Sequence, residues 1–236
     1  DCSAQRCQTI LLKGTTGNGK VVDLNYQYPN LVMNSDDAAT VFAAFGISDK
    51  LMGGKLYMSG KMSQDMKFDG NFVVTDFALK KAPILAKILS LASVTVTSFE
   101  GVETLLGNKG VKFTKASCPF TYNYGVLFID DCVAKGSTIA IVAKGDVNFN
   151  SQKINVNGTA IPENIINTAV KNIPVLNDLF GKKSKEDEVF GVSFRVIGDI
   201  DDPEVKSNPL SLLTPGFLRK VFEGPSSPKP TEKPSN

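Results

Sequence analysis

The chain has 236 residues, of which 42% are hydrophobic and 21% charged, so it is long enough to bury a sizeable core. Its formal net charge is only +2, from 26 basic and 24 acidic side chains, whereas nucleic-acid-binding proteins usually carry a clear positive excess. The chain contains no histidine, which excludes Ser-His and Cys-His nucleophile pairs, HExxH zinc sites and imidazole general bases. Most familiar hydrolase mechanisms are therefore excluded.

The two ends of the chain carry different signals. Residue 1 is Asp rather than Met, and no apolar run approaches the roughly 18 residues of a membrane-spanning helix. We therefore expect a processed chain or an excised fragment, with any membrane anchor outside it. Residues 224–236 read GPSSPKPTEKPSN, a composition that lacks the apolar side chains needed to offset the entropy of ordering. This composition predicts a disordered tail.

Alternation of apolar and polar residues with a period of two dominates the chain and predicts β-strands. The connections between these segments are short and turn-like, as at Gly53-Gly54, Asp69-Gly70 and Lys135-Gly136. Because such connections are mostly too short for parallel crossovers, we expect a meandering antiparallel sheet. The expected strands are residues 9–13, 20–26, 55–60, 67–75, 111–120, 126–134, 138–148, 153–160 and 189–198.

Three short amphipathic helices are expected on one side of this sheet. In the first, Ser35-Asp36-Asp37 supplies an N-cap and an acidic first turn, and Gly46 is placed to end the helix. The second begins at Pro83, since proline is favoured at the first helical position. The expected helices lie near residues 36–45, 83–92 and 98–106. The predicted fold class is therefore β-rich α+β, an antiparallel sheet with several short helices on one side.

The four cysteines form two close pairs, Cys2 with Cys7 and Cys118 with Cys132, and their spacing matches no regular zinc site. Disulfides and free thiols are both compatible with this count. If the chain reverses near Tyr124, Cys118 and Cys132 lie opposite each other on adjacent antiparallel strands, within bridging range. We therefore predict a Cys118–Cys132 disulfide in oxidised protein, which would place the chain in an oxidising compartment.

Two short motifs suggest ligand chemistry but are better explained as turns. Residues 14–20 satisfy the GxxxxGK part of a phosphate-binding loop, but Val21 replaces the Ser or Thr that binds magnesium, and a strand pattern follows in place of a helix. Residues 199–202 resemble the start of a calcium loop, but Pro203 occupies the position of the obligatory glycine. We predict a hairpin turn at the first motif and a solvated turn between strands at the second.

Three further features of the sequence could be functional, but each has a simpler structural interpretation. Adjacent Asp130 and Asp131 would face opposite sides of a strand, so they cannot form an acid/base pair with each other. Asn157 begins a formal glycosylation sequon, which is more often only turn chemistry. Residues 181–188 mix charges of both signs and predict a solvated loop, with contact to anionic lipid as the minority interpretation.

The second and third helices are the most apolar part of the sequence. Their apolar faces either cap the core of the sheet or border a cavity for acyl chains, and the pattern by itself does not separate these alternatives. Under the second alternative the residues that contact acyl chains are Ile84, Leu85, Ile88, Leu89, Phe99, Val102, Leu105 and Leu106.

Several segments together resemble a known family. The most specific are APILAKILSLAS at residues 82–93 and NPLSLLTPGFLRKVF at residues 208–222. Shorter matching pieces lie at residues 35–38, 53–56, 75–79, 105–110, 158–162 and 172–176. In order and spacing these segments resemble the AsmA-like C-terminal region of YhdP-type envelope proteins of Gram-negative bacteria.

This resemblance implies a curved β-sheet groove formed by residues 1–223, followed by the tail at residues 224–236. It further implies a periplasmic module of a protein held in the inner membrane by a segment outside this chain. Such proteins take part in phospholipid transport between the membranes and in outer-membrane integrity, with acyl chains as the bound partner. The resemblance brings no catalytic residue, cofactor or metal, and no nucleic-acid partner.

The sequence is therefore compatible with three functions from different classes. The first is a non-catalytic lipid-binding module of the cell envelope. The second is a structural or protein-docking end domain, in which the helices fill the groove. The third is an enzyme that uses carboxylates alone, such as a glycosidase, which would need two acidic side chains facing one cleft.

Overall fold

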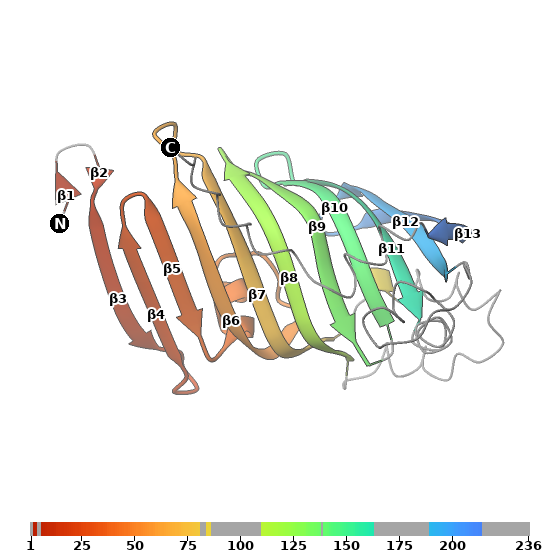
Figure 1. Ribbon diagram of the computed structural model, residues 1–236, viewed down its shortest axis with the longest axis horizontal. Helices are drawn as coiled ribbons and strands as arrows, with labels where there is room; N and C mark the ends of the chain where they lie inside the picture. The colour runs from red at the N-terminus through yellow and green to blue at the C-terminus, as the bar shows by residue number, and fades with distance from the viewer. Residues whose placement is uncertain are drawn as a thin grey trace, which may run out of the picture.

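The protein forms one large antiparallel sheet in which strands that follow each other in sequence are also neighbours in space (Figure 1). The computed structural model describes residues 2–3, 6–80, 84–85, 110–137, 139–162 and 189–213. The sheet has 11 strands in the order β13 to β3, and every neighbouring pair is antiparallel. The result is an open, curved meander.

The strands of this sheet are β3 (Thr9–Thr15), β4 (Val21–Gln27), β5 (Asn30–Ser35), β6 (Leu51–Met62), β7 (Phe68–Leu79), β8 (Val111–Asn123), β9 (Val126–Gly136), β10 (Ile139–Asn148), β11 (Lys153–Pro162), β12 (Val189–Asp199) and β13 (Pro203–Leu213). Two short strands, β1 (Cys2–Ser3) and β2 (Arg6–Cys7), form a separate ladder before β3. One helix, α1 (Ala38–Ala44), interrupts the meander between β5 and β6.

The predicted antiparallel sheet is confirmed, and each of the nine expected strands coincides with an observed one. The expectation of several short helices is not supported. The helix expected at residues 36–45 is α1, and Ile84 and Leu85 are helical, but the rest of 83–92 and all of 98–106 lie outside the described residues. The predicted tail at 224–236 also lies outside them. In the part that is described, the fold is a curved sheet with one short helix.

Two strands of the sheet, β5 and β13, were missed by the sequence analysis. In β5 the apolar residues Leu31, Val32 and Met33 are consecutive, so the segment lacks alternation, and Ser35 also fits the pattern of a helix cap. Strand β13 contains Pro203 and Pro209, and proline removes a hydrogen-bond donor from the ladder. An edge strand tolerates this loss because one of its sides has no strand to bond, and β13 is the last strand of the order.

A β-bulge lies in the middle of the sheet, in β9. The register of β9 shifts against both of its neighbours around Asp130 and Asp131, and Asp131 has a φ of 45°. The residue on β8 beside this shift is Pro119, which has no backbone N–H for the ladder. An extra residue of this kind bends the strand and increases its local twist. Asp130 and Asp131 therefore form a bulge. The sequence analysis treated them as part of a regular strand and did not predict it.

Close packing across the sheet depends on Gly158 in β11. A Cβ atom at this position would lie 2.5 Å from the backbone oxygen of Val142 and would also meet the Phe194 ring. The backbone of β10 cannot move away without breaking its ladder. By contrast, a Cβ at Gly14 in β3 would meet nothing within 4 Å.

We expect Gly158→Ala to lower the free energy of unfolding by about 1–3 kcal/mol, the usual cost of overpacking a well-packed site. Gly14→Ala is the matched control and should change it by less than about 0.5 kcal/mol. Urea denaturation of both variants measures this difference. Equal effects would show that β11 and β12 do not pack as closely as described.

The predicted Cys118–Cys132 disulfide is present and joins β8 to β9, across a sequence separation of 14 residues. The Cys118 side chain is buried. The backbones of Cys2 and Cys7 face each other in the β1–β2 ladder. The bridge therefore ties β9 to the neighbouring strand β8 next to the bulge.

Closing a loop of about 15 residues should contribute roughly 3 kcal/mol through the unfolded chain. We expect the double variant Cys118→Ala/Cys132→Ala to lose about this amount in denaturant unfolding. Reducing agent should destabilise the wild type similarly and affect the double variant much less. Four free thiols in denatured, non-reduced protein would contradict the bridge.

Candidate functional site

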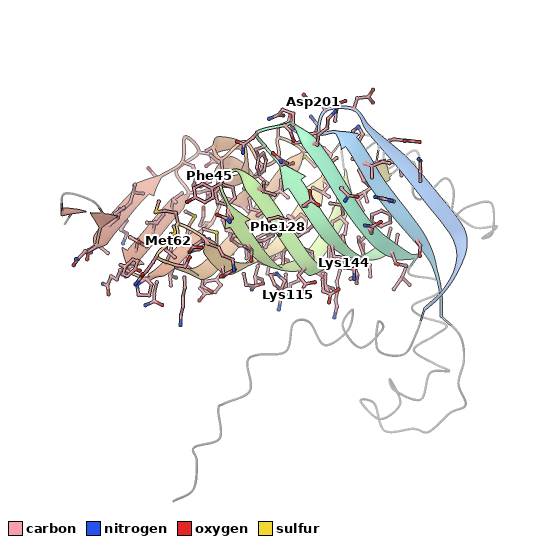
Figure 2. All side chains as sticks on the ribbon, turned by 90° about the horizontal axis from the view of Figure 1, so that it is seen from above. Phe45, Met62, Lys115, Phe128, Lys144 and Asp201 are labelled. Atoms are coloured by element: carbon pink, nitrogen blue, oxygen red, sulfur yellow. A yellow bond between two sulfur atoms is a disulfide. The ribbon has the colours of Figure 1, made fainter. Side chains whose placement is uncertain are left out.

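One face of the sheet is apolar along most of its width, and we call it the helix face because α1 packs on it. Phe42 of α1 contacts Phe72 of β7 edge-to-face, with ring centroids 5.5 Å apart. Ala38 and Val41 of α1 belong to the same buried cluster as Met33, Leu56 and Val74 of the sheet. Phe45, just after α1, and Lys115 of β8 project to opposite sides of the sheet (Figure 2). The side chains of each strand alternate between these two faces.

The register places one row of residues on the helix face across ten strands. Each member pairs directly with the next, except Cys118 and Cys132, which the disulfide joins. The row consists of Leu12, Leu24, Met33, Met58, Phe72, Cys118, Cys132, Ala143, Gly158 and Phe194. Every member is an apolar residue or glycine. We call this set the cross-strand row.

The row lies within a wider apolar band that is only partly covered. Partly buried members of the band occur from β4 to β13, including Val22, Leu31, Ile129, Ile141, Ile154 and Val205. At the β3 end the exposed fraction is higher, 41% for Ile10 and 51% for Leu12. Since α1 has only seven residues and packs against β6, it covers a small part of this band.

Aromatic rings concentrate on the helix face between β6 and β8. Phe68, Phe72 and Phe120 form tilted ring pairs with centroids 5.6 and 5.9 Å apart. Phe77 and Phe113 stack at 5.2 Å. Such pairs add stabilisation beyond their buried area, so they hold the centre of the sheet together.

Helix α1 is held on this face by its N-cap, Asp37. The Asp37 carboxylate accepts hydrogen bonds from the Thr40 backbone N–H at 3.1 Å and the Thr40 hydroxyl at 2.7 Å. Asn18, in the β3–β4 turn, donates to the same carboxylate at 2.9 Å. Ser35, the last residue of β5, accepts a hydrogen bond from the Asp37 N–H at 3.0 Å. The turn at residues 16–20 thus contacts the helix through Asn18 and helps to hold it on the sheet.

Only two of the eight residues predicted to contact acyl chains can be placed. Leu85 is buried in the helix-face cluster, and Ile84 packs against that cluster while partly exposed. Ile88, Leu89, Phe99, Val102, Leu105 and Leu106 lie outside the described residues. The sequence analysis missed the apolar residues on the strands themselves as a candidate surface. Their alternation was visible, but which strands lie side by side was not.

The opposite face is mainly polar, except on β9 to β11, where Val133, Ala140, Val142 and Ile161 lie on it and are buried. Lys55, Thr75, Lys115 and Lys135 follow one another across β6 to β9 in direct register. Burial, with a smaller effect from the neighbouring Lys115 charge, lowers the pKa of Lys135 below its usual value. Lys55 also lies 3.9 Å from Asp36 in an exposed ion pair.

A shallow hollow of about 260 Å³ lies on this opposite face. Its lining includes Asp23, Asn34, Asp36, Lys55, Tyr57 and Thr75. Lysine and carboxylate side chains are both present, so the hollow has no single charge sign that would select an ion. Val21, Leu56 and Val73 also line the hollow, but it spans only β4 to β7, whereas the apolar band of the helix face extends from β4 to β13. The helix face is therefore the larger candidate surface.

The remaining sequence motifs have structural explanations. Residues 14–20 form the end of β3 and the hairpin turn to β4, as predicted, and residues 199–202 form the turn between β12 and β13. Asn157 is exposed in the middle of β11. The charged segment at 181–188 lies outside the described residues.

Among the described residues, no group of three or more His, Cys, Asp or Glu side chains is arranged to hold a metal ion. The same part of the chain has no helix of the length and apolarity needed to cross a membrane. Comparisons with protein-family models, curated proteins and solved structures found no significant match. The function must therefore be argued from the helix face itself.

The Asp37 cap predicts a specific dependence of stability on pH. Burial raises the pKa of Asp37, but the hydrogen bonds from Thr40 and Asn18 outweigh this, and the pKa lies below its ordinary value of 3.8. A carboxyl whose pKa is lowered by folding stabilises the fold above pH 3.8, and this contribution is lost as the pH falls through the folded-state pKa.

We expect Asp37→Ala to cost about 1 kcal/mol at neutral pH, because alanine cannot cap the helix. Asp37→Asn keeps an N-cap acceptor but no charge, so it should lose less, and its difference from the wild type should shrink at acidic pH. Denaturant unfolding at pH 7 and at pH 3 measures both effects. A constant difference between wild type and Asp37→Asn would contradict the proposed role of the charge.

Proposed function

We propose that this chain is a non-catalytic lipid-binding module that holds phospholipid acyl chains on its helix face. The observation that carries the proposal is the cross-strand row, an uninterrupted line of apolar residues and glycine across ten strands of one open sheet. With about 4.8 Å between strands, its nine gaps cover about 43 Å. This distance exceeds the hydrocarbon thickness of a bilayer, about 30 Å.

An acyl chain needs only apolar area to be held. Each methylene removed from water is worth roughly 0.8 kcal/mol, so a partly covered band can bind a chain without a specific headgroup pocket. The band offers such area at Val22, Leu24, Ile129, Ile141 and Ile154, which are only partly buried. Its members Ile139, Val156 and Ala160 are buried and would support the surface from beneath. The polar opposite face would then remain in water.

The resemblance to the AsmA-like C-terminal region agrees with this proposal. In that case the chain is a periplasmic module of a protein anchored in the inner membrane by a segment outside it, and it takes part in phospholipid transport and outer-membrane integrity. The β-groove would be the helix face. A non-catalytic role is consistent with the lack of histidine in the whole chain.

Two isoleucines on neighbouring strands offer a matched test. Ile154 of β11 pairs with Gly198 and lies on the helix face, whereas Ile197 of β12 pairs with Asn155 and lies on the opposite face. Both side chains are partly buried. Ile154→Asn and Ile197→Asn therefore make the same chemical change at nearly the same place, on different faces.

Native mass spectrometry of the protein purified from membrane-containing cells measures bound phospholipid directly. We expect phospholipid on the wild type and on Ile197→Asn, and at least a twofold lower bound fraction on Ile154→Asn. Circular dichroism and thermal unfolding confirm that both variants fold. No phospholipid on the folded wild type, or an equal loss in both variants, would reject the proposal in favour of the structural or protein-docking end domain.

A further inference from the structure

The hollow on the opposite face has two sides with different hydrogen-bonding groups. It lies over four strands that are neighbours in the sheet, β4 to β7 (Figure 1). The β4–β5 side offers the carboxylate and amide oxygens of Asp23, Asn34 and Asp36. The β6–β7 side offers the donors of Lys55, Tyr57 and Thr75. A ligand that lies across the hollow therefore meets acceptors at one end and donors at the other.

The strand register produces this arrangement. Asp23, Asn34 and Tyr57 follow one another in direct register across β4, β5 and β6. Lys55 lies two residues from Tyr57 on the same face and pairs with Thr75 of β7. Asp36 directly follows β5, and its backbone N–H donates to the Val21 oxygen at 3.0 Å, which holds it beside β4.

The charged centre of the hollow is the pair formed by Asp36 and Lys55. Its carboxylate oxygen and ammonium nitrogen are 3.9 Å apart, which is longer than a hydrogen bond between such groups. The two side chains are 51% and 70% exposed. Both charged groups can therefore form hydrogen bonds to a third molecule.

A ligand with two adjacent charges of opposite sign fits this pair best. In an α-amino acid the ammonium nitrogen and the carboxylate carbon are bonded to the same carbon and lie about 2.5 Å apart. If the ammonium lies beside Asp36 and the carboxylate beside Lys55, the four charges alternate in sign around a ring. Every neighbouring pair then attracts, whereas a simple ion would be attracted by one residue and repelled by the other.

The surrounding charges also favour a ligand without net charge. Asp23 lines the hollow as well, and its direct ladder partner is Lys13 of β3. Together with Asp36 and Lys55 these residues make two positive and two negative charges. Their sum is zero, which matches a zwitterion.

We propose that the hollow binds a free α-amino acid, with its ammonium group on Asp36 and its carboxylate on Lys55. The volume of about 260 Å³ lies below the roughly 300–1,000 Å³ of pockets for drug-sized ligands, so it suits one small molecule. Val21 and Val73 in the lining can contact an aliphatic side chain. The proposal goes beyond lipid binding, concerns the other face of the sheet and does not depend on lipid.

Three compounds of similar size test which charges the hollow requires. L-Leucine has both charges, L-leucinamide has only the ammonium, and 4-methylpentanoate has only the carboxylate. In two-dimensional NMR titrations of the full chain, we expect L-leucine to shift amide resonances of β4 to β7 with a dissociation constant of about 1 mM. The other two compounds should bind at least about tenfold more weakly, because each lacks one charge-assisted contact.

Substitutions test the two residues. Lys55→Met removes the charge but keeps a long side chain, and Asp36→Asn keeps the shape of the side chain. Lys61→Met is the matched control, since Lys61 is an exposed lysine six residues further along β6 on the same face and does not line the hollow. We expect about tenfold weaker L-leucine binding in the first two variants and no change in Lys61→Met. Thermal unfolding confirms that all three variants fold.

The proposal is overturned if L-leucine shifts no resonance of β4 to β7 at about 20 mM, twentyfold above the expected dissociation constant. Equal binding of L-leucinamide would indicate a site for a simple cation, and equal binding of 4-methylpentanoate a site for a simple anion; either result rejects an α-amino acid. An equal loss in Lys61→Met would show general attraction to the surface. None of these outcomes involves phospholipid, so this proposal and the lipid-binding proposal fail separately.

Discussion

The antiparallel hydrogen-bond ladder is the constraint on which the rest of the structure depends. Each strand from β4 to β12 pairs on both sides, so the register of every pair determines which side chains share a face. A slip of one residue would turn a whole strand over. The bulge at Asp130 and Asp131 prevents such a reversal in β9. It accommodates one extra residue, so that Cys132 still faces Cys118 on the helix face.

The lipid-binding proposal depends on the difference between the two faces of the sheet. The helix face is apolar from β4 to β13 and α1 covers only part of it, whereas the opposite face carries lysines, carboxylates and amides. An apolar ligand and a polar solvent can therefore contact the same thin sheet at once.

Sequence patterns predicted the strands where alternation was regular and failed where it was not. Nine strands and α1 were found from alternation, turn residues and the Asp37 cap, and the Cys118–Cys132 bridge followed from the hairpin between them. Strand β5 was missed because its apolar residues are consecutive, and β13 because of Pro203 and Pro209. Of the predicted site residues, Leu85 lies in the helix-face cluster and Ile84 packs against it, whereas Ile129, Ile141 and Ile154 on the strands were not predicted.

By itself, the sequence determined that the chain is an antiparallel β-protein without histidine chemistry, since period, turn lengths and composition are local properties. Only the tertiary structure decided which apolar residues form one surface. Leu12 and Phe194 are 182 positions apart in sequence, yet they belong to one row because the registers of nine strand pairs add up across the sheet and around the bulge.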